Sequence, residues 1–118
     1  MKVLLVDDEE EFVTALAERF SLRGIDTDCA TNGMDAVRMA QEKTYDVVVV
    51  DLKMPKICGP EVMESIRKQD ANVKFIFVTG HGSEESFRAC LDAGACEYLL
   101  KPVKIELLIE KVLEAAQT

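Results

Sequence analysis

Three aspartates and a lysine follow apolar segments of the chain, and their types suit the chemistry of cations and phosphate. Asp7 and Asp8 come directly after the apolar run 3–6, and Asp51 follows four consecutive valines. Three carboxylates held together repel one another, so such a cluster favours a bound cation. With Lys101 beside them the formal charge is 1 − 3 = −2, which one divalent cation neutralises. Oxygen ligands without His or Cys indicate Mg²⁺, with Mn²⁺ as the alternative, rather than zinc or copper.

Two further side chains extend this cluster toward phosphoryl transfer. Lys101 offers a point charge for a phosphoryl group, and Thr79 offers a hydroxyl donor. Phosphoryl transfer depends mostly on positioning and charge neutralisation, which these groups supply. Asp51 is the best candidate for the nucleophile, because a central strand would fix it and carboxylates form acyl phosphates.

The elements that must position these residues are short strands alternating with amphipathic helices. The apolar runs are 3–6, 27–30, 47–50, 75–78 and 98–100. Runs that are apolar on both faces suit a parallel sheet covered by helices on each side. Helices are expected from Phe12 to a stop at Gly24, over 34–43 and 60–68, before Gly94, and from Ile105 to Ala116. In the last of these the expected apolar face is Ile105, Leu108, Ile109, Val112, Leu113 and Ala116.

This alternation predicts an α/β fold, a (βα)5 doubly wound sandwich about a central five-stranded parallel sheet. Right-handed crossovers place every strand-to-helix loop at one edge of the sheet, where open α/β folds carry their sites. Asp7, Asp8, Asp51, Thr79 and Lys101 should therefore converge there, although dozens of residues separate them.

Each of these residues also has an ordinary structural explanation. Asp8 with Glu11 fits a helix capping box, and Glu9 to Glu11 fit an exposed first turn stabilised by the helix dipole. Thr79 alone could be a turn residue, and Lys101 alone a surface charge. The occurrence of all these residues at the ends of four separate strands favours a functional site over these separate explanations.

Composition limits the function classes. The chain has 118 residues, expected to form one domain over 1–118, and a formal net charge of −8, which argues against direct nucleic-acid binding. No apolar run reaches the length of a membrane span and no signal peptide is evident, so a cytoplasmic location is expected. The cysteines lack a CxxC pair and are interpreted as small buried apolar residues in a reducing compartment: Cys29, Cys58, Cys90 and Cys96.

Four ordered motifs give the chain a specific resemblance over nearly its whole length. They are Val6-Asp7-Asp8-Glu9, Val50-Asp51-Leu52-Lys53-Met54-Pro55, Val78-Thr79-Gly80 and Tyr98-Leu99-Leu100-Lys101-Pro102. With these motifs the sequence resembles the receiver domain of bacterial two-component response regulators, which has a flavodoxin-like fold. The stretch 79–83 also resembles receivers of nitrogen-regulation-type transcriptional activators.

The resemblance implies a role for each matching residue. Asp51 would accept a phosphoryl group from the phosphohistidine of a sensor histidine kinase or phosphotransfer protein. Asp8, Asp51 and the backbone carbonyl of Lys53 would bind Mg²⁺, and Asp7 would contribute through water. Thr79 and Lys101 would contact the phosphoryl oxygens, and the domain would assist both its own phosphorylation and its own dephosphorylation. Lys101-Pro102 would be a cis peptide.

The resemblance also implies a switch. When Thr79 moves toward the phosphoryl group, Tyr98 would turn inward and change the face formed by the fourth helix, fifth strand and fifth helix. That face is the expected surface for a partner or a homodimer. The kinase, the signal, and whether an effector domain follows Thr118 stay open, but any DNA binding would belong to another domain or protein.

Two positions depart from the family pattern. Lys56-Ile57-Cys58 replaces the usual acidic approach to Gly59, so the loop geometry could differ, and a redox role for Cys58 is a minor alternative. His81 is interpreted as an exposed loop histidine, at a position where the family tunes water access to the phosphoaspartate.

Three other functions fit the sequence less well. A Mg²⁺-dependent aspartyl-phosphate phosphohydrolase would need Asp-x-Asp and an inserted cap, whereas this chain has Asp7-Asp8 and no insertion. A flavodoxin-like cofactor binder would meet repulsion from the acidic first loop. An interaction-only pseudo-receiver would not need the intact Asp8, Asp51, Thr79 and Lys101.

Overall fold

The computed structural model of the chain describes residues 1–80, 82 and 84–117. Five strands and five helices alternate strictly along it: β1 (Lys2–Val6), α1 (Glu10–Leu22), β2 (Asp26–Ala30), α2 (Gly33–Glu42), β3 (Val47–Val50), α3 (Gly59–Gln69), β4 (Lys74–Thr79), α4 (Glu84–Asp92), β5 (Glu97–Leu100) and α5 (Ile105–Ala116). All strand pairs are parallel, in the order β2-β1-β3-β4-β5. The predicted (βα)5 sandwich is confirmed.

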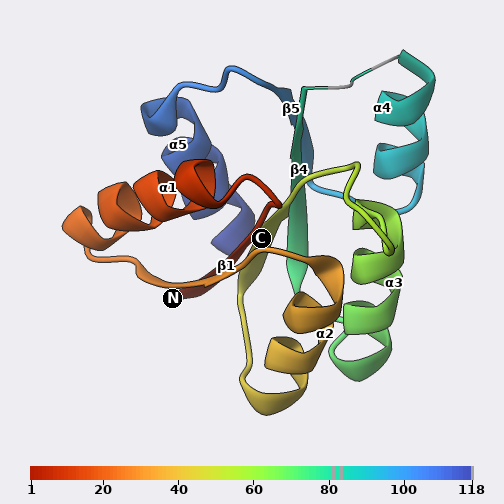
Figure 1. Cartoon of the computed structure of the whole chain (residues 1–118), viewed down its shortest axis with the longest axis horizontal. Coiled ribbons are helices and arrows are strands. Elements are labelled where there is room, and N and C mark those ends of the chain that lie inside the picture. The colour runs from red at the N-terminus through yellow and green to blue at the C-terminus, as the bar shows by residue number, and fades with distance from the viewer. Residues whose placement is uncertain (81, 83, 118) are drawn as a thin grey trace.

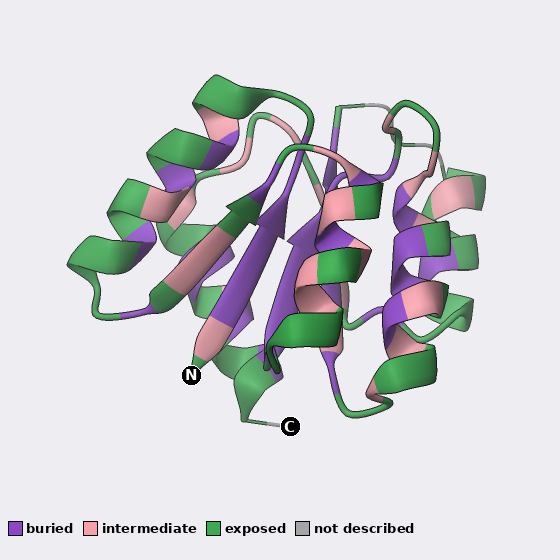
Figure 2. Ribbon diagram, turned by 60° about the horizontal axis from the view of Figure 1, so that its bottom comes forward, coloured by how far each residue is buried: buried purple, intermediate pink, exposed green. Residues whose placement is uncertain are grey.

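Helices cover both faces of the sheet (Figure 1). The helices α1 and α5 lie on one face, and α2, α3 and α4 lie on the other. Two apolar clusters fill the spaces between these layers, one containing Phe20 and Leu108 and the other containing Phe75 and Phe77. Figure 2 shows the central strands buried along their length and the helices exposed on their outer surfaces. A strand that is apolar on both faces, as β3 is, needs cover on both sides, which this sandwich provides.

The helix boundaries agree with the expected ones to within about two residues, but several details differ. The helix α1 has Glu9, not Asp8, at its N-cap, and no side chain caps it, so the capping-box prediction is wrong. In α5 the chain buries Ala115 instead of Ala116, and Leu113 stays 41% exposed. Of the residues of α4, only Cys90 is buried, whereas Phe87 and Leu91 are 40% and 37% exposed.

The interpretation of the cysteines as buried residues holds for Cys90 alone. Cys29 and Cys96 are exposed and Cys58 is half-buried, and all four thiols are free. Cys29 lies on β2, an edge strand whose burial is partial along most of its length. A residue on such a strand lacks a neighbouring strand on one side, which explains its exposure.

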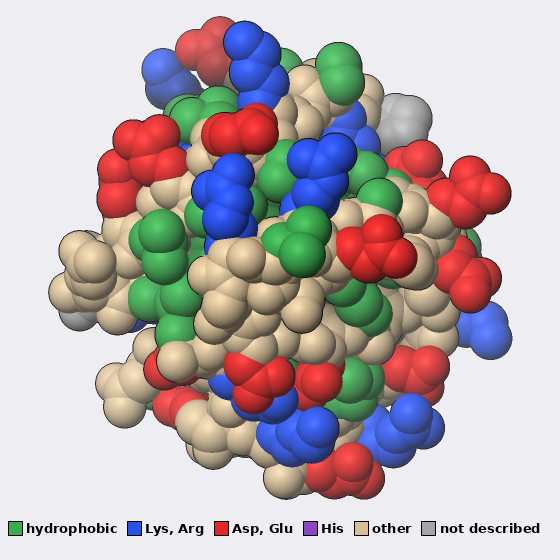
Figure 3. Space-filling view, turned by 90° about the vertical axis from the view of Figure 1, so that its left-hand side faces the viewer, with side chains coloured by type: hydrophobic (Ala, Val, Ile, Leu, Met, Phe, Trp, Pro, Cys, Tyr) green, Lys and Arg blue, Asp and Glu red, His purple; other side chains and the backbone are tan. Residues whose placement is uncertain are grey.

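Charged side chains of both signs lie together on the surface. Figure 3 shows the side of the molecule that carries α1 and α5, where Asp and Glu side chains are interspersed with Lys and Arg side chains. Apolar side chains lie between them on this face. Within the residues that the structure describes, no helix combines the length and the apolar character that crossing a membrane requires.

A hydrogen bond between Tyr45 and Asp28 ties the segment before β3 to β2. The Tyr45 hydroxyl donates to Oδ2 of Asp28 at 2.7 Å, and the ammonium of Lys43 lies 3.3 Å from the same oxygen. Burial alone would raise the pKa of Asp28, but the hydrogen bonds from Tyr45 and Lys43 outweigh it and lower the pKa. The carboxylate therefore stabilises the fold in its charged form.

Replacing Tyr45 with phenylalanine is expected to lower the free energy of unfolding by about 1–2 kcal/mol at neutral pH, because Asp28 loses a buried donor. A lowered pKa in the folded state stabilises the protein above the ordinary aspartate value of 3.8, and this stabilisation is lost as the pH falls through the folded-state value. The difference between wild type and Tyr45→Phe should therefore narrow below about pH 3.8. Urea unfolding at several pH values measures it, and an equal difference at every pH would contradict the explanation.

Candidate functional site

The strand register brings the predicted site residues together. Val6 of β1 pairs with Val50 of β3, so Asp7 and Asp51 follow at adjacent positions on neighbouring strands. The backbone amide of Asp51 donates to the carbonyl of Val6 at 3.0 Å, which continues the ladder to the end of the strand. The two aspartates are therefore held side by side by the pairing of the two central strands.

Thr79 and Lys101 are positioned in the same way on the other side of Asp51. Thr79 ends β4 and pairs with Leu100 of β5, and the amide of Lys101 donates to the carbonyl of Thr79 at 2.9 Å. The peptide bond between Lys101 and Pro102 is cis, as the resemblance implied. All the strand-end residues predicted to converge lie at this edge of the sheet.

Three carboxylates form a group that could hold a metal ion. One oxygen each from Asp7, Asp8 and Asp51 lies within 4.8 Å of the others. Asp7 and Asp51 are buried, at 4% and 6% exposure, whereas Asp8 is exposed. Hard oxygen ligands with one side open to water match the coordination that Mg²⁺ prefers. The residues present therefore fit a divalent cation, and a fit to zinc would need His or Cys ligands that this group lacks.

The Lys101 ammonium is the positive charge of the site. Its Nζ lies 2.8 Å from Oδ2 of Asp7, 2.6 Å from Oε1 of Glu9 and 3.6 Å from Oδ2 of Asp51. It also lies 4.5 Å from the centre of the Phe12 ring, where the ring face attracts a cation. Burial works to lower the pKa of Lys101, but the hydrogen bonds from its ammonium to Asp7 and Glu9 outweigh burial and raise it. The lysine is thus charged throughout the physiological range.

Burial has the opposite effect on Asp7. Removal from water raises the pKa of Asp7, and the hydrogen bonds that its carboxylate accepts from Lys101 and from the backbone amide of Glu9 offset only part of the shift. Even beside the Lys101 ammonium, it is therefore costly to keep the Asp7 carboxylate charged. This cost explains why the site would favour binding of a divalent ion.

The loop that follows Asp51 is held close to it. The amide of Lys53 donates to Oδ1 of Asp51 at 3.3 Å, and the amide of Gly59 donates to the carbonyl of Leu52 at 2.9 Å. A Cβ atom at Gly59 would lie 2.5 Å from the carbonyl oxygen of Asp51, so only glycine permits this close approach. Lys56 has a positive φ of 70°, which a bulky residue adopts with strain.

The structure adds two residues to the site that the sequence pattern does not predict. Glu9 was interpreted as exposed first-turn surface, and Phe12 as a core residue of the first helix, yet both contact the Lys101 ammonium. The sequence signals for Glu9 were its place two residues after Asp7 and its position in the motif Val6-Asp7-Asp8-Glu9. His81 lies outside the described residues.

Tyr98 lies on β5, and its side chain is buried at 6% exposure. Its ring packs edge-on against Phe87 of α4, with 5.3 Å between ring centroids. Thr79 is fully buried. Tyr98 therefore already lies inward in this structure, between the strand and α4.

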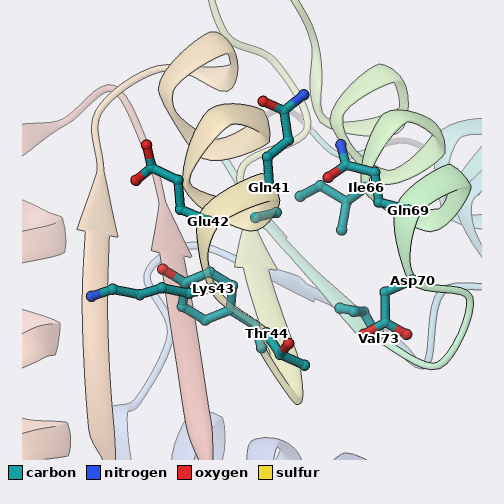
Figure 4. A pocket seen from close by; sticks show the side chains of 10 residues that line it. Gln41, Glu42, Lys43, Thr44, Ile66, Gln69, Asp70 and Val73 are labelled. Atoms are coloured by element: carbon teal, nitrogen blue, oxygen red, sulfur yellow. The ribbon is translucent and has the colours of Figure 1, made fainter.

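A separate hollow of about 270 Å³ lies at the opposite edge of the sheet. Figure 4 shows Glu42 and Lys43 at the end of α2, and Gln69 and Asp70 at the end of α3, around it. It lies at the amino ends of β3 and β4, away from the strand ends that carry Asp51. It contains none of the predicted site residues.

Comparison with known proteins identifies the family. The family model of the response regulator receiver domain matches residues 3–113. The transcriptional regulatory protein PrrA of Mycobacterium tuberculosis is 32% identical over 111 residues, which are 94% of this chain and 48% of PrrA. The regulatory protein AtoC of Escherichia coli is 29% identical over 96% of this chain and 25% of its own length. The chain thus spans half or less of these relatives.

Solved structures agree. The receiver domain of the Francisella response regulator 1452 superposes with a TM-score of 0.90 at 33% identity, covering 98% of this chain and 96% of that one. A CheY-like receiver domain protein from Methanospirillum hungatei gives a TM-score of 0.93 at 28% identity, covering 98% and 93%. The chain therefore belongs to the response regulator receiver domain family, the phosphoacceptor signalling domains of two-component systems.

Proposed function

We propose that Asp51 is the phosphoacceptor of this receiver domain and that its donor is the phosphohistidine of a sensor histidine kinase or phosphotransfer protein. The observation that carries the proposal is the placement of Asp51: a carboxylate at 6% exposure, grouped with Asp7 and Asp8, and 3.6 Å from the Lys101 ammonium. Of the three grouped aspartates, only Asp51 lies at the end of the central strand β3.

In the proposed reaction a carboxylate oxygen of Asp51 attacks phosphorus. The bond from phosphorus to the donor imidazole nitrogen breaks, and the imidazole keeps the electron pair. Asp7, Asp8, Asp51 and the backbone carbonyl of Lys53 would hold Mg²⁺, or Mn²⁺ in its place, with Asp7 acting through water. When bound, the ion supplies positive charge that neutralises the phosphoryl oxygens.

The other groups bind and orient the phosphoryl group. The ammonium of Lys101 and the hydroxyl of Thr79 donate to its oxygens, where charge develops during transfer. Lys101 reaches Asp51 with little movement, since the two charged groups are 3.6 Å apart. The same groups would orient the water that later hydrolyses the acyl phosphate, so the domain assists its own dephosphorylation. The phosphohydrolase alternative has no support from the family match.

The output surface of the proposal is the face formed by α4, β5 and α5. Thr79 and Tyr98 would couple the acceptor to this face, since both are buried, Thr79 at the end of β4 and Tyr98 on β5 against Phe87 of α4. Several large apolar side chains are exposed on these three elements: Phe87, Leu91, Leu100, Leu107 and Leu113. Exposed large apolar side chains favour binding of a protein partner, an effector domain or a second copy.

The family match supports the remaining proposals. The relatives are longer than this chain, so an effector function, including any contact with DNA, would belong to another domain or protein. We propose one domain over residues 1–118 and a cytoplasmic location, where sensor kinases present their phosphohistidine.

Incubation with acetyl phosphate and Mg²⁺ tests the proposal directly. Intact-mass measurement should show one phosphoryl adduct, which is lost on standing because acyl phosphates hydrolyse. Chelation of Mg²⁺ beforehand should reduce the adduct strongly. No adduct with Mg²⁺ present, together with no change in the NMR spectrum on adding beryllofluoride, would contradict the proposal.

A further inference from the structure

We propose that Glu9 is a positioning residue that restrains Lys101 and thereby slows phosphorylation of Asp51. This inference rests on the proposed function of Asp51 and adds a residue that regulates the same site. The geometry points to Glu9 because its carboxylate oxygen lies 2.6 Å from the Lys101 ammonium, the nearest of its carboxylate contacts.

The distances define which carboxylate holds the lysine. The Nζ atom of Lys101 is a full ångström nearer to Glu9, at 2.6 Å, than to Asp51, at 3.6 Å. Charge-assisted hydrogen bonds have lengths of about 2.7–2.9 Å, so Lys101 is bonded to Glu9 and Asp7 rather than to Asp51. A phosphoryl group on Asp51 must therefore draw the ammonium away from a bond already made.

The start of the first helix also fixes the position of Glu9. Glu9 lies at the N-cap of α1, and its side chain makes no capping hydrogen bond to the helix. Its backbone amide donates to Oδ1 of Asp7 at 2.9 Å, which fixes the loop beside the site. The loop therefore holds the Glu9 carboxylate beside Lys101 while α1 is left without a side-chain cap.

Glu9 is separable from the metal-binding group. The three grouped carboxylates are those of Asp7, Asp8 and Asp51, and Glu9 is not among them. Its side chain is 63% exposed, whereas that of Lys101 is 15% exposed. A change at Glu9 therefore removes a partner of the lysine and leaves the proposed ion ligands in place.

The restraint predicts a rate effect that depends on Lys101. In Glu9→Gln the ammonium keeps its bond to Asp7 but is no longer held by the Glu9 carboxylate. The initial rate of adduct formation from acetyl phosphate should therefore rise about two- to fivefold, as expected for an ion pair with one exposed partner. The acetyl phosphate concentration that gives half the maximal rate should stay the same, because the substitution does not change how the protein binds acetyl phosphate. The melting temperature should change little.

A double-mutant cycle separates this restraint from simple charge repulsion of the anionic donor. In a Lys101→Met background, followed over long incubations, Glu9→Gln should have no effect, because its action passes through the lysine. The matched control is Glu10→Gln, which removes the same charge one residue away in the first turn of α1 and should leave the rate at the wild-type value.

The outcomes distinguish this inference from the proposed function. Glu9→Gln at the wild-type rate, an equal acceleration in Glu10→Gln, or an undiminished acceleration in the Lys101→Met background would each overturn the restraint. An adduct that fails to form even in the wild type would instead overturn the proposed role of Asp51.

Discussion

Asp51→Asn is expected to abolish the phosphoryl adduct altogether, while the protein stays folded. The amide that replaces the carboxylate has nearly the same shape and can still accept the hydrogen bond from the Lys53 amide. It is a far weaker nucleophile toward phosphorus, so no acyl phosphate forms. Because the substitution also removes one of three crowded carboxylates, the melting temperature without Mg²⁺ should not fall.

Intact-mass measurement after incubation with acetyl phosphate and Mg²⁺ reads out this result. Asp92→Asn, a change of the same type at an exposed residue of α4, is the matched control and should give the wild-type amount of adduct. An adduct of undiminished size in Asp51→Asn would show that the acceptor lies elsewhere. Asp7 and Asp8 would then be the next residues to replace.

Lys101→Met is expected to have the largest effect on stability. Methionine keeps most of the length of the side chain and its apolar stem, but it leaves Asp7 and Asp51 buried without their neighbouring cation. Removing one partner of a largely buried ion pair is destabilising, because the remaining charge stays buried without a compensating charge. In the presence of a chelator the free energy of unfolding should fall by about 2–4 kcal/mol.

Divalent cations should reverse much of this loss. Binding to the native state alone raises the melting temperature, so millimolar Mg²⁺ should stabilise the wild type. It should stabilise Lys101→Met more, because the ammonium no longer adds positive charge beside the ion. Lys104→Met, at an exposed lysine three residues along, serves as the control and should respond to Mg²⁺ as the wild type does. Melting curves unaffected by Mg²⁺ in both proteins would contradict the metal site.

The sequence predicts the fold and the position of the site for the same physical reason. The strands β1, β3 and β4 are apolar on both faces, so only a covered parallel sheet can bury them, and that sheet brings its strand ends to one edge. Asp7, Asp51, Thr79 and Lys101 could therefore be grouped from their places after strands. The strand register then places these residues side by side, since Val6 pairs with Val50 and Thr79 pairs with Leu100.

The contacts within the site could not be predicted in this way. Whether Lys101 bonds to Glu9 or to Asp51 depends on side-chain rotamers and on differences of about one ångström, and hydrophobic periodicity carries no information on either. The exposure of Phe87 and Leu91 could not be predicted from the sequence either. Their spacing fits a buried helix face, yet in α4 only Cys90 is buried.

The hydrogen bond from Lys101 to Asp7 joins residues 94 positions apart, and this affects when the site can form during synthesis of the chain. A chain emerging from the ribosome can form β1 and α1 early, but it has no complete acceptor until β5, the last strand, docks beside β4. Contacts so distant in sequence form late because they must close long loops. A chain that lacks β5 therefore cannot be phosphorylated in the manner proposed here, so phosphorylation requires a receiver domain that has folded through its last strand.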